Sequence, residues 1–207
     1  MQNGPLAVPN GRDILPTVNT LLTLPFGVKL GTQDWHPPTH TSFAPNHGKA
    51  PFTSSYTITH PSDPSRSYTT TLWPPHCIQD TPGAQLLSGL RSDLLDGVVK
   101  KGKREDVEMY SAFYDPFKLE DSGMGQRLRD SGVGKVFVVG LAGDYCVRAT
   151  AIDARREGFE VVLVEEGTRC VDPEVWGRVK SELEGEGIKI VSMESDDVQR
   201  LETIGAA

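Results

Sequence analysis

Short apolar runs alternate with helix-like stretches along the second half of the chain. Residues 136–139 (VFVV) form a β-branched run that predicts a buried strand, and residues 160–165 (EVVLVE) predict another. Residues 145–155, between them, have the composition of a helix. The other predicted elements are helices at 13–24, 124–131, 172–184 and 195–203 and strands at 28–33, 97–100 and 188–193.

This alternation indicates the fold class. Strands separated by helices pair in parallel, and a parallel sheet is normally covered by helices on both faces. We therefore predict an α/β protein with three layers, α/β/α, around a mostly parallel sheet. Ligands of such folds bind beyond the carboxyl ends of the strands. Asp34, Lys101 and Cys146 all lie at or just past predicted strand ends.

Residues 37–75 break the pattern. The segment is rich in Pro, Ser and Thr and shows little helical or strand periodicity, which predicts a long irregular insertion. A chain of 207 residues fits one domain with a sizeable core. We therefore expect a single domain over residues 1–207 with a loop insertion at about 37–75. Its histidines and the cluster LWPPHC at 72–77 favour a functional loop.

Charge and cysteine content indicate which partners and which cellular compartment to expect. A net charge of −7 argues against nucleic acid and anionic membranes as partners. No apolar run approaches the length of a membrane span, and the start MQNGPLAVPNG lacks a secretory pattern. Three cysteines at irregular spacing fit a reducing compartment and thiol chemistry. We expect a cytoplasmic protein, with the nucleus and the peroxisome as alternative locations. The sequence is also compatible with assembly into a homo-oligomer.

Cys146 is the candidate nucleophile. It follows a predicted strand and a glycine-containing turn, and Asp144 is placed to cap the next helix. A helix start lowers the pKa of a thiol, and the backbone N–H groups from Ala142 to Cys146 could bind an oxyanion. Lys101 is the cation best placed to hold a thiolate. A buried structural cysteine is the alternative interpretation.

A second group of residues predicts a metal site. Asp34 and His36 are separated by one residue at a strand end, so their side chains can converge, and His76 could complete the set. One carboxylate and two imidazoles suit Zn, Fe or Mn with room for water, rather than a closed structural zinc site. The histidines that we interpret as ordinary loop residues are His40, His47 and His60.

Several segments together resemble the nicotinamidases of the isochorismatase-like cysteine hydrolase family. The matching segments are LAVPNGRDILPTVN, TQDWHPPTHTSFA, LWPPHCIQDTPGA, KG followed by YSAF, and VVGLAGDYCVRATAIDA. They occur in the family order over nearly the whole chain. The combination of D-W-H-P, W-P-x-H-C and G-x-A-x-D-Y-C-V is specific, and the insertion at 37–75 is similar to that of fungal members.

The resemblance implies the isochorismatase-like hydrolase fold and a metal-assisted substrate site. Asp34, His36 and His76 would bind a divalent metal that holds the pyridine nitrogen of nicotinamide. Zinc is favoured, with iron and manganese as alternatives. A non-proline cis peptide bond is expected between Leu141 and Ala142.

The resemblance also implies a catalytic role for the nucleophile turn. Cys146 would attack the carboxamide carbon, and the N–H groups of Ala142 and Cys146 would form the oxyanion hole. Lys101 would lie beside the cysteine, and Trp73 and Tyr145 would wall the pocket. Ammonia would leave, and water would then release nicotinate.

The sequence differs from the family pattern at its N-terminal end. Family members carry a central apolar strand ending in D-x-Q-x-D-F just upstream of the residues that match NGPLAVPNG, whereas the sequence begins at Met1. We expect this first central strand and its catalytic aspartate to be absent. Loss of a positioned acid–base group typically costs about 10²–10⁴-fold in rate, so we expect little or no activity from the chain as given. The alternatives are a non-catalytic metal- or ligand-binding member and another isochorismatase-like amidohydrolase.

Overall fold

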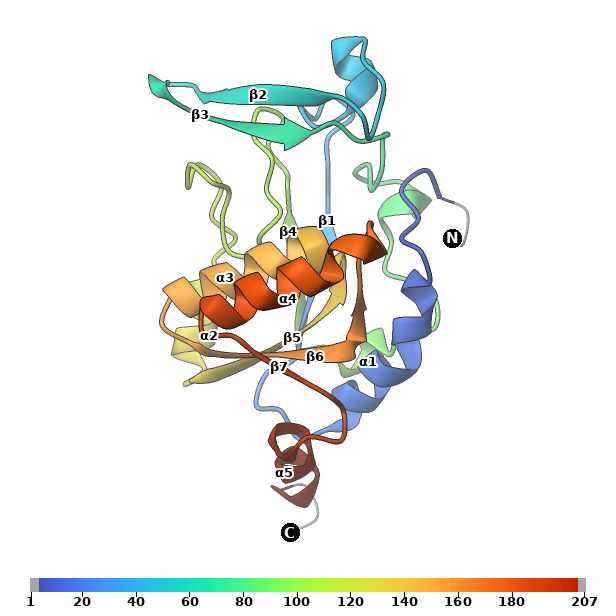
Figure 1. Ribbon diagram of the computed structural model, residues 1–207, viewed down its shortest axis with the longest axis vertical. Helices are drawn as coiled ribbons and strands as arrows, with labels where there is room; N and C mark the ends of the chain where they lie inside the picture. The colour runs from blue at the N-terminus through green and yellow to red at the C-terminus, as the bar shows by residue number, and fades with distance from the viewer. Residues whose placement is uncertain (1–3, 205–207) are drawn as a thin grey trace.

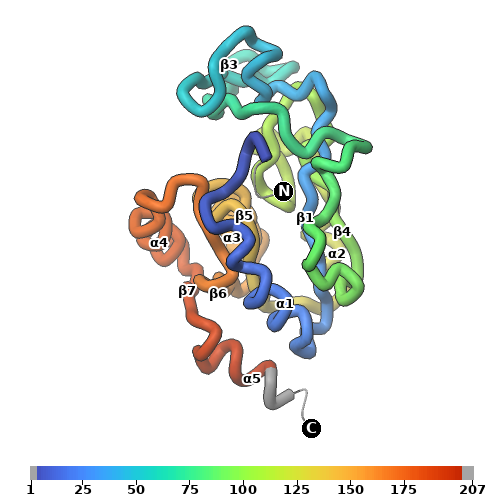
Figure 2. Tube along the Cα trace, turned by 90° about the vertical axis from the view of Figure 1, so that its right-hand side faces the viewer, coloured from blue at the N-terminus to red at the C-terminus, as the bar shows by residue number. Residues whose placement is uncertain are grey.

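The computed structural model describes residues 4–204 and shows two ladders of parallel strands (Figure 1). β5 (Lys135–Leu141), β6 (Glu160–Arg169) and β7 (Lys189–Val191) pair in that order. β1 (Leu30–Asp34) and β4 (Gly97–Lys101) form the second ladder, which lies to the right of β5 and β6 in Figure 2. Within residues 4–204 no hydrogen-bonded ladder joins β1 to β5. All of these pairings are parallel, as the alternating sequence pattern predicts.

Helices cover both faces of the β5–β6–β7 sheet. Alternate residues of a strand point to opposite faces. Val136 and Val138 therefore pack with α3 (Arg148–Arg156) and α4 (Trp176–Gly185) on one face. Phe137 and Val139 point to the other face, where α1 (Leu15–Thr23) and α5 (Asp196–Ile204) pack. The predicted three-layer α/β/α architecture is confirmed.

A smaller helix connects the two ladders. α2 (Met124–Asp130) buries Met124 and Leu128 in the same core as Val99 of β4 and Val138 of β5. The carboxyl ends of β1 and β4 meet near the turn that follows β5, because Lys101 Nζ lies 2.7 Å from Asp34 Oδ1 and 3.5 Å from Cys146 Sγ. Among the described residues, no helix has the length and apolar character needed to cross a bilayer.

The prediction that 37–75 is an irregular loop is wrong in part. The segment contains an antiparallel hairpin, β2 (Ser55–His60) and β3 (Asp63–Thr71), which lies above the body of the protein in Figure 1. Its strands are rich in Thr and Ser, so apolar alternation is weak, but β-branched threonine still favours extended backbone. Ile58 anchors the hairpin by packing against Val107 and Phe117.

Two further predictions concern the start of the helix over 145–155 and the first central strand. The helix predicted over 145–155 begins as a π-helical turn, Gly143–Val147, before α3 starts at Arg148. The predicted absence of a first central strand concerns the region of Met1 to Asn3. That region lies outside the described residues, so the absence of the strand stays a prediction.

Candidate active site and metal centre

Asp34, His36 and His76 meet at the end of β1. Each offers one ligand atom, and these atoms all lie within 4.8 Å of one another. Two backbone hydrogen bonds bring the distant His76 segment here. The His36 N–H donates to Cys77 O at 3.0 Å, and the Gln79 N–H donates to His36 O at 2.8 Å. The sequence prediction of this triad agrees with the geometry.

Both imidazoles are oriented for metal binding. His36 Nδ1 donates to Gly102 O at 2.8 Å, and His76 Nδ1 donates to Pro74 O at 2.9 Å. A carbonyl oxygen only accepts, so each Nδ1 carries the proton and each Nε2 keeps its lone pair. Burial lowers the pKa of His36 to about 4 and lowers the pKa of His76, so both rings are neutral. The donor set therefore fits a divalent metal.

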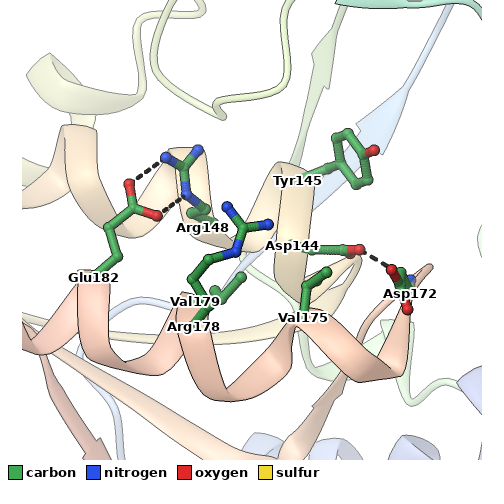
Figure 3. Close-up of a pocket in the computed structure, with 8 residues that line it drawn as sticks. All are labelled: Asp144, Tyr145, Arg148, Asp172, Val175, Arg178, Val179 and Glu182. Carbon is green, nitrogen blue, oxygen red and sulfur yellow. Dashed lines mark hydrogen bonds and ion pairs between the residues drawn. The ribbon is translucent and has the colours of Figure 1, made fainter.

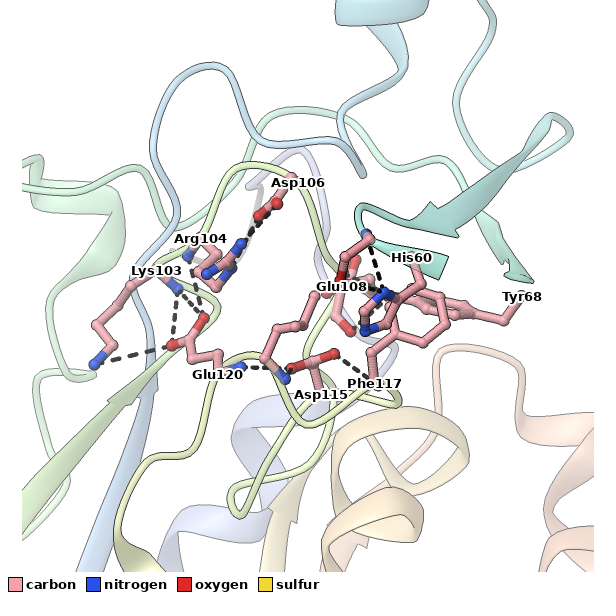
Figure 4. Close-up of polar contacts among 11 residues, drawn as sticks. His60, Tyr68, Lys103, Arg104, Asp106, Glu108, Asp115, Phe117 and Glu120 are labelled. Atoms are coloured by element: carbon pink, nitrogen blue, oxygen red, sulfur yellow. Dashed lines mark hydrogen bonds and ion pairs between the residues drawn. The ribbon is translucent and has the colours of Figure 1, made fainter. Parts of the chain in front are cut away.

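Gly102 is a site residue that the sequence reasoning missed. Its φ is +65°, and a Cβ atom built there would lie 2.6 Å from His36 Nδ1. The backbone can approach the imidazole only because glycine has no side chain. Glu120 holds the following turn, since its carboxylate accepts from the N–H groups of Lys103 and Arg104 at 3.0 and 3.1 Å (Figure 4).

Lys101 lies between the Asp34–His36–His76 triad and the candidate nucleophile Cys146. It ends β4, pairs in register with Asp34 at the end of β1, and is 3% exposed. Its Nζ lies 2.7 Å from Asp34 Oδ1 and 3.5 Å from Cys146 Sγ, and it donates to Met109 O at 2.9 Å. Burial alone would lower the pKa of Lys101, but Asp34 and Cys146 raise it. The side chain is therefore a buried ammonium.

The same ion pair keeps Asp34 ionised. Burial would raise the pKa of this carboxyl, but the charge of Lys101 and its hydrogen bond outweigh burial and hold the pKa well below its usual range. A half-buried carboxylate with a cation on one side and two imidazoles on the other is a suitable metal ligand.

Cys146 does not have the lowered pKa that its position predicts. Burial raises the pKa of the thiol to about 11, although Lys101 opposes this effect. A helix start lowers a thiol pKa where water can reach it, and here loss of hydration is the larger effect. At neutral pH the resting side chain is therefore a thiol beside an ammonium group.

Asp144 does not cap the helix as predicted. Its carboxylate accepts from the N–H groups of Val171 and Asp172 at 2.9 and 3.0 Å, which ties the nucleophile turn to the loop after β6. Figure 3 shows Asp144 directed toward Asp172, and nearby Arg148 of α3 pairs with Glu182 of α4. The turn is thus fastened to its surroundings by a contact between residues far apart in the sequence.

The nucleophile turn has the backbone form that the resemblance implies. The peptide bond between Leu141 and Ala142 is cis. Ala142 O accepts from the N–H groups of Tyr145 and Val147 at 3.1 and 3.0 Å, so the turn closes around Cys146.

Three aromatic rings form one wall beside this turn. Trp73 and Tyr145 were predicted from the sequence, and their ring centroids lie 4.9 Å apart in an edge-to-face arrangement. Tyr110 was missed. Its ring lies 5.3 Å from Tyr145, and its hydroxyl accepts from Trp73 Nε1 at 2.9 Å. We name Trp73, Tyr110 and Tyr145 the aromatic wall.

Glu108 is a third residue that the sequence reasoning missed. It is buried close enough to Lys101 to interact electrostatically, and burial raises its pKa to about 7, with Lys101 opposing the rise. Tyr68 fixes its backbone, because the hydroxyl accepts from the Glu108 N–H at 2.9 Å and donates to Glu108 O at 3.3 Å (Figure 4). A single acidic residue in an aromatic loop gave no sequence signal.

The remaining histidines lie outside the triad. His40 is fully buried, with Nδ1 2.8 Å from Ser42 Oγ and its ring 4.2 Å from that of His36. It packs behind a metal-site residue, so it is more than the ordinary loop histidine predicted. His47 Nε2 donates to Thr41 O at 2.6 Å, as an ordinary loop histidine would.

Comparison with known proteins places this geometry in a family. The profile of the isochorismatase domain matches residues 35–195. The curated nicotinamidase of Saccharomyces cerevisiae is 35% identical over 198 residues, which cover 91% of each chain.

Two solved structures are similar over almost the whole chain. The yeast nicotinamidase bound to the inhibitor nicotinaldehyde has a TM-score of 0.86 at 34% identity, covering 91% of this chain and 92% of that one. The pyrazinamidase of Pyrococcus horikoshii in complex with zinc has a TM-score of 0.72 at 34% identity, covering 93% and 92%.

Proposed function

The chain belongs to the isochorismatase domain family, and from this membership we propose that it is a nicotinamidase. The reaction is amide hydrolysis, in which nicotinamide and water give nicotinate and ammonia. The observation that carries the proposal is the position of Lys101, whose ammonium contacts both the Asp34 carboxylate and the Cys146 thiol. A nucleophile, a cation and a candidate metal centre therefore meet at the carboxyl ends of three strands.

Cys146 is the nucleophile in this proposal. The thiol gives up its proton, its sulfur bonds to the carboxamide carbon, and the C–N bond breaks as the nitrogen takes up that proton and leaves as ammonia. Water then attacks the thioester, which releases nicotinate and returns a proton to the sulfur. The Lys101 ammonium, 3.5 Å from the sulfur, favours the negative thiolate. We assign the oxyanion to the backbone N–H groups of Ala142 and Cys146, because preorganised donors stabilise charge that develops during acyl transfer.

Asp34, His36 and His76 are the proposed ligands of a divalent metal. Bound there, the metal would supply a Lewis-acidic position that can hold a pyridine nitrogen. We propose zinc, with iron and manganese as alternatives, because one carboxylate and two neutral imidazoles suit these ions. The zinc complex of the Pyrococcus relative supports this choice.

Trp73 and Tyr145 are the proposed substrate-binding side chains. Their rings belong to the aromatic wall beside Cys146, and a flat pyridine ring packs well against aromatic surfaces. The inhibitor of the yeast relative, nicotinaldehyde, is a pyridine with a carbonyl group and supports a pyridine-carboxamide substrate.

The direct test is turnover by the purified, metal-loaded chain. We expect nicotinate and ammonia to form in equal amounts and to disappear in Cys146→Ala. Cys170→Ala is the matched control, since it removes another buried thiol that is not beside Lys101. Product formation that survives Cys146→Ala, or the absence of nicotinate from the unaltered chain, would contradict the proposal.

A further inference from the structure

Tyr110 connects the aromatic wall to the β2–β3 hairpin. Its hydroxyl lies 2.9 Å from Trp73 Nε1 and 2.9 Å from Thr70 Oγ1 on β3. An indole N–H only donates, so the tyrosine oxygen accepts from Trp73. The tyrosine proton is then free to go to Thr70, which gives a directed chain of hydrogen bonds from Trp73 through Tyr110 to Thr70.

The Trp73 backbone is already fixed by other contacts. Its N–H donates to Ser42 O at 2.7 Å, and its carbonyl accepts from the Ala44 N–H at 2.8 Å. These backbone bonds leave the indole free to rotate about its side-chain torsion angles. Trp73 as a whole is 4% exposed, and the bond to Tyr110 supplies the partner for the single polar atom of its side chain. Tyr110 therefore selects the orientation of the indole.

That orientation bears on the neighbouring ring. Trp73 meets Tyr145 at an interplanar angle of 86° and a centroid distance of 4.9 Å, and Tyr110 contacts Tyr145 from a second direction at 5.3 Å. Tyr145 directly precedes the nucleophile Cys146. A rotated indole would therefore change the surface that a planar ligand meets beside the thiol.

We propose that Tyr110 is a positioning residue that sets substrate affinity by holding the Trp73 indole in place through its hydroxyl. This inference rests on the proposed function, because it takes Trp73 and Tyr145 of the aromatic wall to be the side chains that bind a pyridine carboxamide or carboxylate. Tyr110 acts on the substrate through Trp73, and Thr70 on β3 completes its hydrogen bonding.

The first test is Tyr110→Phe, which keeps the ring and removes only the hydroxyl. We expect KM for nicotinamide and Kd for nicotinate to rise about tenfold, as loss of one buried hydrogen bond implies, while kcat changes less than about twofold. Tyr114→Phe is the matched control, since its hydroxyl pairs with Glu157 away from the site, and it should leave KM and Kd unchanged. Equal effects of the two variants would overturn the inference.

The second test asks whether Tyr110 acts through Trp73. Trp73→Phe has no indole N–H, so adding Tyr110→Phe should change Kd for nicotinate by less than about twofold in that background. A full, additive loss would overturn the inference. The indole Nε1–H resonance of Trp73 gives a readout independent of activity, and it should shift in Tyr110→Phe but not in Tyr114→Phe. An unchanged resonance would refute the orienting bond, whereas an inactive unaltered chain would refute the proposed function.

Discussion

Lys101 and Asp34 end neighbouring parallel strands, and their side chains form a 2.7 Å ion pair inside the protein. The pairing follows from register, since residues opposite each other at the ends of two parallel strands present their side chains at the same edge. It gives the site a fixed positive charge beside the thiol and a fixed negative charge beside two imidazoles. Most of the expected behaviour of the site depends on this pair.

Lys101→Met should destabilise the protein strongly. Removal of the ammonium leaves the Asp34 carboxylate, which is 23% exposed, without its cation. Breaking a fully buried pair typically costs about 3–5 kcal/mol in free energy of unfolding, and partial exposure places the expected loss toward the lower end of this range. Chemical denaturation of the metal-free protein and of the variant measures this loss in free energy of unfolding. Lys103→Met is the matched control, because Lys103 is half exposed in its ion pair with Glu120 and such a pair contributes about 0–1 kcal/mol. Similar losses in the two variants would show that the Lys101 pair has no special role.

Gly102→Ala should weaken metal binding. The added methyl group would collide with the His36 ring and displace it from its hydrogen bond to Gly102 O. We expect metal affinity to fall about 10–100-fold, as for other losses of support to a ligand. Competition with a chelator measures the affinity. Gly132→Ala is the control, because its φ of +69° causes the same backbone strain while its surroundings are open. Unaltered affinity in Gly102→Ala would contradict the role of Gly102.

His36→Ala should remove metal binding at one equivalent. It takes away a neutral imidazole whose Nε2 is free to coordinate, and the remaining carboxylate and imidazole form a weak site. Metal content after loading with zinc, iron or manganese, followed by dialysis, measures the loss and ranks the three ions. His47→Ala should bind as the unaltered chain does, since His47 Nε2 is occupied by Thr41 O. Retention of a full equivalent by His36→Ala would exclude the proposed triad.

Alkylation of Cys146 should rise steeply with pH. The pKa of the thiol is raised to about 11. At any pH below this pKa, raising the pH by one unit increases the thiolate fraction about tenfold. We expect the rate with iodoacetamide to rise through pH 7–9 without a plateau, measured by mass spectrometry of the peptide that contains Cys146. Lys101→Met should slow the reaction further, because loss of the cation disfavours the thiolate. A plateau near pH 7 would mean that the cation outweighs burial.

The sequence pattern alone was sufficient to predict the features that depend on chain order and on the periodicity of apolar residues. The alternating strands and helices, the ends of β1 and β4 at Asp34 and Lys101, and the turn that carries Cys146 were all readable from the sequence. The hairpin β2–β3 was not, because its threonine-rich strands lack apolar alternation and become recognisable only when Ile58 packs on the body.

The sequence by itself determined the fold class, the family and the chemical identity of the site residues, because these depend on residue types and their order. Only the tertiary structure decided the raised pKa of Cys146, the partners of Asp144, and the contacts of Gly102 and Tyr110. Each of these depends on burial or on contact between residues distant in the chain. Desolvation and close packing are properties of the assembled interior, and a linear pattern does not carry them.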